Sequence, residues 1–334
     1  MTMKKIFTLI LVSIAFVLSS CGDRGYVKST FTIFGTISNI TYESPGKEDL
    51  QAGIDSVLNR VNNSLSPFLP NSIVSKINRN DRVKLNDYFV EVYLEAKRFS
   101  VLTNGAYDVT VGPLVNEWGF GFEPGSEKHY KERINSLMQY VGFEKVALMK
   151  DSIVKRDPRV KLDFSSLAKG YGVDKVGEYL ASQGCANYLV DIGGEVRVKG
   201  KNPQGKNWQV GVAKPIEQNL DDHAVQEILR VTNLALATSG NYRNFYLQDG
   251  KRYAHTIDPR SGYPVQSRLL SATILAKTCM EADAAATACM VMGLEKAIDF
   301  IEVLDGVEGY FIYNSDEAEY AVYYTEGFRK YLKD

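Results

Sequence analysis

The spacing of hydrophobic and polar residues changes repeatedly along the chain, and each change predicts a different element. Apolar and polar positions alternate over residues 26–42, as they do in a strand with one buried face. Apolar positions within residues 50–61, and again within residues 85–96, recur three and four residues apart. That spacing places them on one face of a helix, so we predict two amphipathic helices there.

Further strand-like runs follow the two helices, and several are separated only by short turns. The pair Gly193-Gly194 lies between two of them, as is typical of a hairpin. Because the strands come in hairpins with helices interspersed, without a regular βαβ alternation, we predict an α+β fold built mostly from antiparallel sheets. The runs are residues 145–149, 152–156, 187–192, 195–199, 208–213, 227–238, 253–257, 270–276 and 310–313.

The start of the chain has the pattern of an export signal. Lys4 and Lys5 precede the apolar run Ile6 to Leu18, which is too short to span a bilayer. The run ends in Leu18-Ser19-Ser20-Cys21, which resembles a bacterial lipobox, where cleavage before the cysteine is followed by lipid attachment. A plain cleaved signal with a chance cysteine is the alternative. Both interpretations predict an exported protein.

The rest of the chain is predicted to form one functional domain. Its length of 334 residues fits one large domain or two modest ones, and 45% hydrophobic with 24% charged residues is ordinary for a globular protein. We divide the chain into a signal peptide over residues 1–20, a lipidated tether over 21–30 and one domain over 31–334. Residues 215–224, which are polar and rich in acids, are predicted to form a surface loop.

Charge and cysteine content exclude several classes of function. Loss of Lys4 and Lys5 with the signal brings the formal net charge from −1 to about −3. A nucleic-acid-binding protein would show a basic excess or stripe, and this chain shows neither. Cys185, Cys279 and Cys289 have no C-x-x-C spacing, so they predict neither a zinc site nor a disulfide framework. We expect them to be small buried hydrophobic residues.

Candidate chemistry is concentrated in five stretches, the first two of which are rich in small residues. GAYDVTVGPLVNEWGFG, residues 105–121, would let backbone N–H groups approach a ligand beside a flat aromatic wall, or would simply pack as a loop. LDFSSLAKGYGVD, residues 162–174, reads as the end of a strand, two serines and then a helix. A helix N-terminus with Lys169 one turn in suits a phosphate. Alternatively, Ser165 is only a helix cap and Lys169 a solvated side chain, but this does not explain Asp163.

The next two stretches lie close together, ATSGNYR at residues 237–243 and YAHTIDPRSGYP at residues 253–264. His255 is a candidate general base, because an imidazole titrates near neutral pH. A lone histidine is more often structural than catalytic.

The fifth stretch is EADAAATACMVMG, residues 281–293. Thr278 and Glu281 form a capping-box pattern that predicts a helix start. Asp283 and Thr287 then lie on one helix face, and their oxygens suit a hard cation such as Mg²⁺. A tightly packed helix with a satisfied aspartate is the alternative.

Six motifs, taken in their order along the chain, resemble the FAD:protein FMN transferase family, the ApbE-type periplasmic lipoproteins. They are GAYDVTVGPLVNEWGFG, LDFSSLAKGYGVD, YLVDIGGEV, ATSGNYRNF, HTIDPRSGYPV and ADAAATACMVMG. The resemblance extends from Phe34-Gly35-Thr36 to about residue 313. It implies an Mg²⁺-dependent enzyme that splits FAD, links FMN by a phosphoester to a threonine or serine of an acceptor protein, and releases AMP. It also implies a lipid anchor on Cys21 in a bacterial membrane, with the domain facing the periplasm.

The resemblance also assigns site residues, position by position. His255 is the implied base, and Asp283 the residue whose loss is costliest. The implied metal ligands are the side chains of Asp283 and Thr287, with backbone oxygens of Ser166 and Ala286. The implied FAD contacts are Phe34, Phe68, Ala106, Tyr107, Asp108, Asp163, Lys169 and Ile257. The chain departs from the family pattern at Phe34-Gly35-Thr36 and at Phe68-Leu69-Pro70-Asn71-Ser72.

Three alternative functions stay open at this point. A periplasmic FAD pyrophosphatase would use water in place of the acceptor hydroxyl, and a flavin-binding lipoprotein would only store the cofactor. A penicillin-binding type of serine acyltransferase is suggested by Ser166-x-x-Lys169 and Ser239-Gly240-Asn241. The third motif of such enzymes, Lys-Thr-Gly, is matched only by Lys277-Thr278-Cys279, which lacks the glycine.

Overall fold

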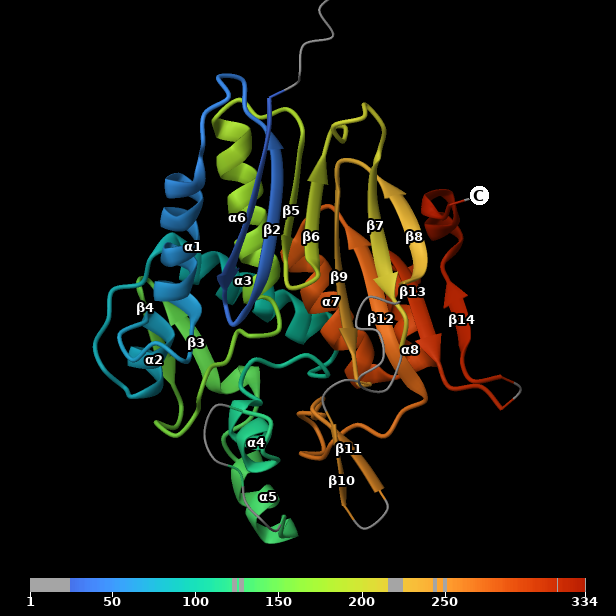
Figure 1. Cartoon of the computed structure of the whole chain (residues 1–334). Coiled ribbons are helices and arrows are strands. Elements are labelled where there is room, and N and C mark those ends of the chain that lie inside the picture. The colour runs from blue at the N-terminus through green and yellow to red at the C-terminus, as the bar shows by residue number, and fades with distance from the viewer. Residues whose placement is uncertain are drawn as a thin grey trace, which may run out of the picture.

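An eight-stranded antiparallel sheet runs through the molecule, with strand order β1-β2-β5-β6-β9-β12-β13-β14 (Figure 1). The computed structural model describes residues 25–121, 125, 129–215, 225–242, 245–248, 251–316 and 318–333. The predicted signal peptide, Cys21 and most of the predicted loop at 215–224 lie outside these residues. The strands of the sheet are β1 (Tyr26–Ile33), β2 (Thr36–Glu43), β5 (Tyr188–Ile192), β6 (Glu195–Lys199), β9 (Leu234–Gly240), β12 (Leu269–Ala276), β13 (Glu308–Tyr313) and β14 (Ala321–Tyr324).

Three separate hairpins and a set of helices complete the described chain. The hairpins are β3 (Val146–Met149) with β4 (Ser152–Lys155), β7 (Trp208–Ala213) with β8 (Val225–Val231), and β10 (Phe245–Gln248) with β11 (Lys251–Ala254). The helices are α1 (Gln51–Leu65), α2 (Ile73–Asn78), α3 (Asp87–Leu102), α4 (Gly112–Glu117), α5 (Lys131–Met138), α6 (Ala168–Ser182), α7 (Cys279–Met292) and α8 (Leu294–Glu302), with 3₁₀ turns η1 (Phe143–Lys145) and η2 (Glu326–Tyr331).

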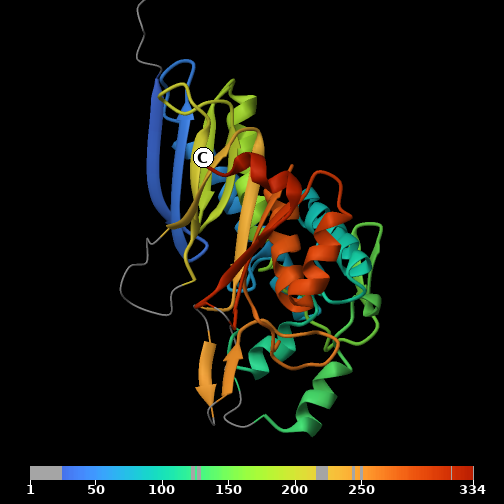
Figure 2. The ribbon, with the colours of Figure 1, turned by 90° about the vertical axis from the view of Figure 1, so that its right-hand side faces the viewer.

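Helices cover one face of the sheet, and the β7–β8 hairpin covers part of the other (Figure 2). The apolar faces of α1 and α6 pack on β2 and β5, where Ile54 and Val176 meet Ile40 and Val190. Helices α3, α7 and α8 share a larger core with β9, β12 and β13. On the opposite face, Trp208 of β7 packs over the central strands together with η2. The sheet therefore holds α6 and α7 against its centre.

The helix boundaries follow from local capping. The predicted helix over 85–96 begins at Asp87, because the Asn86 side chain accepts a hydrogen bond from the backbone N–H of Phe89. The predicted capping box also forms, since Thr278 accepts from the N–H of Glu281 at the start of α7. The predicted mixture of helices and antiparallel hairpins is present throughout the described residues. Within that part of the chain, no helix combines the length and apolarity needed to cross a membrane.

Two predicted segments are wrong in their boundaries. The run over 26–42 is a hairpin, because the chain turns at Phe34-Gly35, where both residues have positive φ. The run over 227–238 is likewise two strands, with Asn233 at φ 52° in the turn. The predicted tether over 21–30 is too long, since Tyr26–Thr30 already pair with β2.

The three described cysteines are free and buried, as predicted.

Candidate active site

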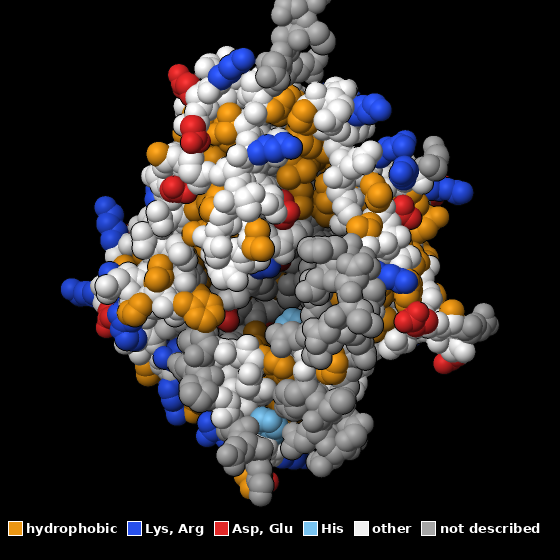
Figure 3. Space-filling view, in the orientation of Figure 1, with side chains coloured by type: hydrophobic (Ala, Val, Ile, Leu, Met, Phe, Trp, Pro, Cys, Tyr) orange, Lys and Arg blue, Asp and Glu red, His pale blue; other side chains and the backbone are white. Residues whose placement is uncertain are grey.

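A cavity of about 510 Å³ opens where the N-terminus of α6, the β5–β6 turn, the end of β9 and one face of α7 meet. The space-filling view shows this face of the molecule hollowed near its centre (Figure 3). A cavity of this size falls in the range of small-molecule and cofactor sites. Candidate residues that line it are Ala106, Tyr107, Asp108, Asp163, Ser166, Lys169, His255, Ile257, Asp283 and Thr287. The fold thus brings together segments that are far apart in the sequence.

Helix α7 supplies one wall of the cavity. Asp283 and Thr287 lie one turn apart, so both side chains face the same space, and Asp283 is only 4% exposed. The Asp283 carboxylate accepts a hydrogen bond of 3.1 Å from the backbone N–H of Gly170. The hydroxyls of Thr287 and Ser239 are 3.4 Å apart. Ser239, at the end of β9, therefore adds an oxygen that had been assigned only to a rival motif.

An ion pair between α6 and β6 lines the cavity. Lys169 Nζ contacts Glu195 Oε1, and the Glu195 side chain is 5% exposed. Glu195 Oε2 is also buried, and no described group hydrogen-bonds to it. Lys169 is therefore ion-paired, and its side chain is still 36% exposed to solvent. Glu195 had no predicted role, and the available signal was an acid directly after the Gly193-Gly194 turn.

These charges shift one another's pKa values. Burial, and then the charge of Glu195, raise the pKa of Asp283 well above its ordinary value, against the opposing effects of Lys169 and the Gly170 N–H. Burial also raises the pKa of Glu195. For Lys169, burial acts to lower the pKa, but the charges of Glu195 and Asp283 outweigh it and raise the pKa. Two buried carboxylates thus share one ammonium, which leaves an excess of negative charge.

The segment before α6 is a turn and not the predicted strand end. Asp163 Oδ1 accepts hydrogen bonds from the backbone N–H and the hydroxyl of Ser165, at 2.9 and 2.5 Å. Helix α6 begins only at Ala168, and no side chain caps it at Leu167. Ser165 as a helix cap is therefore wrong, because its hydroxyl is committed to Asp163. Ser166 lies in the same turn, with its hydroxyl 2.8 Å from that of Tyr107.

Tyr107 and Asp108 line the cavity for different reasons. Tyr107 is almost fully buried, and its hydroxyl reaches Ser166. Asp108 accepts from the N–H and hydroxyl of Thr110, at 2.7 and 2.6 Å, and from the N–H of Phe143 at 2.8 Å. The Asp108 carboxylate is therefore used to hold its own loop in place.

His255 follows β11 and is half-buried at the cavity wall. Its ring is 6.3 Å from the ring of Phe120, at an interplanar angle of 68°. Ile257 is held by a backbone bridge to Pro264.

Three residues assigned by resemblance do not line this cavity. Phe34 lies in the β1–β2 turn, where its ring packs so close to Gly172 that an added methyl group there would sit 2.8 Å from it. Phe68 is 71% exposed, after the end of α1. Ala286 is fully buried within α7.

Comparisons with known proteins agree on one family. A model described as the ApbE family matches residues 34–311. The chain is 42% identical over 276 residues to an FAD:protein FMN transferase of Vibrio cholerae, covering 80% of this chain and 82% of that protein. It is 39% identical over 316 residues to an FAD:protein FMN transferase of Haemophilus influenzae, covering 90% and 91%.

Solved structures agree with these relatives. The flavin transferase ApbE from Vibrio cholerae superposes with a TM-score of 0.83 at 39% identity, over 92% of this chain and 99% of that one. The ApbE protein from Thermotoga maritima gives a TM-score of 0.80 at 27% identity, over 92% and 100%. The predicted α+β fold is therefore confirmed.

Proposed function

This chain belongs to the ApbE family, and we infer that it is an FAD:protein FMN transferase, which moves FMN from FAD to an acceptor protein at the cavity described above. The observation that carries this proposal is the grouping of Asp283, Thr287 and Lys169 at one cavity wall. The reaction needs a bound pyrophosphate to be positioned and its charge offset, more than it needs covalent help from the protein.

We propose that a divalent cation, with Mg²⁺ as the favoured ion, binds beside Asp283. Residues that line the cavity offer the Asp283 carboxylate, the Thr287 hydroxyl and the backbone oxygen of Ser166, a set that suits a hard cation also held by phosphates. Ala286 does not line the cavity and stays a prediction as a ligand. No group of three histidine, cysteine, aspartate or glutamate side chains forms a metal cluster in the described part of the chain. The raised pKa of Asp283 supports the fit, because a cation would offset the buried negative charge. When bound, the cation would supply charge neutralisation at the phosphates.

The chain's own residues prepare the other parts of the reaction. The Lys169 ammonium, held at Glu195, faces the cavity as a fixed positive charge for a phosphate oxygen. The Gly193-Gly194 turn leaves a wall without side chains beside it. Tyr107 and Ile257 supply apolar lining for the flavin or the adenine. Phe34 and Phe68, which lie away from the cavity in this structure, stay predictions as FAD contacts.

We propose that His255 accepts the proton of a threonine or serine hydroxyl on the acceptor. The hydroxyl oxygen then bonds to the phosphorus of the FMN half, the anhydride bond breaks, and AMP leaves with the bond's electron pair. His255 lines the cavity and is half-buried, so an acceptor side chain can reach it from solvent. If water took the place of the hydroxyl, the same site would hydrolyse FAD.

Export and lipid anchoring through Cys21 are proposed from the sequence of residues 1–21, which lie outside the described residues. The predicted membrane side is the periplasmic one. Metabolic labelling with a radioactive fatty acid tests the proposal, since label should enter the wild-type protein and be absent from Cys21→Ala. Equal labelling of both proteins would contradict it.

One experiment tests the activity. The chain from residue 22 onward is incubated with FAD, Mg²⁺ and a candidate acceptor, while AMP release and acceptor mass are followed. An FMN-sized mass increase that Asp283→Ala abolishes supports the transferase. AMP with free FMN and no adduct would favour the pyrophosphatase, and no AMP with any divalent cation would refute both.

A further inference from the structure

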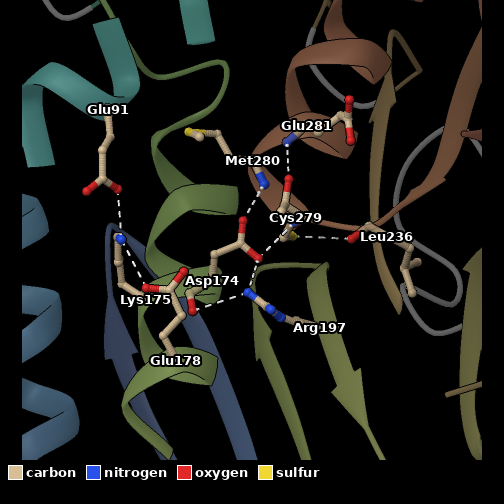
Figure 4. Close-up of polar contacts among 10 residues, drawn as sticks. Glu91, Asp174, Lys175, Glu178, Arg197, Leu236, Cys279, Met280 and Glu281 are labelled. Atoms are coloured by element: carbon tan, nitrogen blue, oxygen red, sulfur yellow. Dashed lines mark hydrogen bonds and ion pairs between the residues drawn. The ribbon is translucent and has the colours of Figure 1, made fainter. Parts of the chain in front are cut away.

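The start of α7 is held by a carboxylate from another helix. Asp174, in the second turn of α6, has a side chain that is only 5% exposed. Its Oδ1 accepts a hydrogen bond from the backbone N–H of Cys279 and its Oδ2 from that of Met280, each at 2.9 Å (Figure 4). One carboxylate thus spans the first two residues of α7.

These two bonds complete the capping of α7. The first N–H groups of a helix have no partner within it. Thr278 accepts from the N–H of Glu281 through its side chain, and Asp174 accepts from the two N–H groups between them. The N-terminus of α7 is therefore held by its own cap, Thr278, and by Asp174 of α6.

The charge on Asp174 is balanced from the sheet. Arg197 of β6 donates to Asp174 Oδ1 through Nη1 at 2.8 Å (Figure 4). Two residues earlier on the same face of β6, Glu195 pairs with Lys169 of α6. The α6–β6 contact therefore contains two ion pairs of opposite polarity, one at the cavity and one beneath the start of α7. Sliding of α6 along β6 would break both ion pairs.

The geometry links this clamp to the cavity. On α6, Gly170 and Asp174 are one turn apart, and on α7 the residues they contact, Asp283 and Cys279, are also one turn apart. A methyl group on Gly170 would lie 2.4 Å from the Cys279 carbonyl oxygen, so the helices already touch backbone to backbone. Asp283 is thus held on α6 by its hydrogen bond from Gly170, and Asp174 fixes the helix turn that precedes it.

We propose that Asp174 is a positioning residue of the transfer reaction, which sets the place of the Asp283 carboxylate and Thr287 hydroxyl by holding the first turn of α7 against α6. This inference rests on the proposed function. Asp174 does not line the cavity, and acts only through α7. Residues that orient metal ligands typically contribute 10–100-fold to metal affinity or activity.

The test is Asp174→Asn in the chain from residue 22 onward. Asparagine keeps the shape, but its amide nitrogen would face an N–H donor, so one of the two bonds to α7 is lost. The probe is Mn²⁺, titrated at saturating FAD without acceptor, with free Mn²⁺ followed by electron paramagnetic resonance. We expect the dissociation constant for Mn²⁺ to rise about 10- to 100-fold. FAD binding in EDTA, followed by flavin fluorescence, should change less than about twofold, since Asp174 is not among the residues that line the cavity.

Lys175→Met is the matched control. Lys175 is the next residue on α6, and its ion pairs go to Glu91 and Glu178 at 2.8 and 3.0 Å (Figure 4). It should lower thermal stability slightly and leave the Mn²⁺ affinity unchanged. If Asp174→Asn behaves in the same way, with a lower melting temperature and unchanged Mn²⁺ affinity, the role is only structural and the proposal is overturned.

Two further outcomes separate this inference from the proposed function. Mn²⁺ affinity that depends on Asp174, in a protein that releases AMP but never modifies an acceptor, keeps the positioning role and refutes the transferase. No Mn²⁺ binding by the wild type refutes the positioning role. Should Asp174→Asn not fold, Arg197→Lys provides the same test. Lysine cannot reproduce the contact between the planar guanidinium of Arg197 and the Asp174 carboxylate. We expect a smaller loss of Mn²⁺ affinity in the same direction, and an unchanged affinity would overturn the proposal.

Discussion

Gly170→Ala tests whether the close crossing of α6 and α7 sets the active site. The added methyl group would lie 2.4 Å from the Cys279 carbonyl oxygen and 2.9 Å from Asp283 Cβ. The first of these atoms belongs to the backbone of α7, so it cannot turn aside as a flexible side chain would. Restoring an ordinary contact of about 3.4 Å requires α7 to withdraw by about 1 Å.

The expected magnitudes follow from that displacement. Overpacking of a core contact costs about 1–3 kcal/mol. Replacing glycine by alanine within a helix returns roughly 0.5–1 kcal/mol. The free energy of unfolding should therefore fall by no more than about 2.5 kcal/mol, and the variant should fold. Activity should fall much more, because a misplacement of about 1 Å at a reacting centre costs on the order of 10²-fold in rate.

Urea unfolding and the initial rate of FMN transfer measure the two effects separately. Gly46→Ala serves as a control, because its methyl group meets only the flexible Glu48 side chain, at 3.3 Å. The control should match the wild type in rate. A Gly170→Ala protein with wild-type rate and wild-type stability would refute the claim that this crossing positions Asp283.

Four further predictions concern stability. Asp283→Asn should raise the free energy of unfolding without cation by about 0.5–2 kcal/mol while abolishing transfer, as urea unfolding in EDTA and the adduct assay will show. Asp108→Ala should lower the free energy of unfolding by about 1–3 kcal/mol, because it leaves three loop donors unpaired, and an unchanged urea midpoint would contradict this. Phe164→Ala, at a fully buried position, should cost about 3–5 kcal/mol by the same measurement. Burial, with the charge of Lys161, lowers the pKa of Lys155 to about 8 from an unfolded value near 10.5. The unfolded chain then binds more protons between these values, so stability should rise with pH across that window, and Lys155→Met should flatten the rise.

The sequence could predict what short-range patterns control. The capping box at Thr278 and the cap at Asn86 each need only residues three positions apart, so α7 and α3 could be located before any tertiary structure was known. The turn at Phe34-Gly35 could not, because a bulky residue at positive φ is uncommon there. The first residues of β1 were predicted to belong to a tether because they are mostly polar. A strand at the edge of a sheet can carry few apolar side chains, so its sequence resembles that of a tether.

The roles of Glu195 and Asp174 depend on long-range packing instead. Lys169 and Glu195 are 26 residues apart, and Asp174 and Cys279 are 105 apart. Each pair forms only when α6 lies across both β6 and α7. A single acid after a glycine turn, or within a helix, carries no local sign of such a partner. The candidate site could therefore be assembled from motifs, but the contacts that hold it together could not.

Helix α7 combines packing and chemistry in one short sequence. Its alanines are buried on nearly every side, against β9, β12, α6 and α8, and such a position normally calls for an entirely apolar helix. Small side chains are required because the backbone of α6 lies in contact at Gly170. The same closeness brings the Gly170 N–H and the Lys169 charge within reach of Asp283, so the carboxylate is tolerated without a full ion pair of its own. The tight packing of the alanines is thus what allows a buried aspartate to remain available to a ligand.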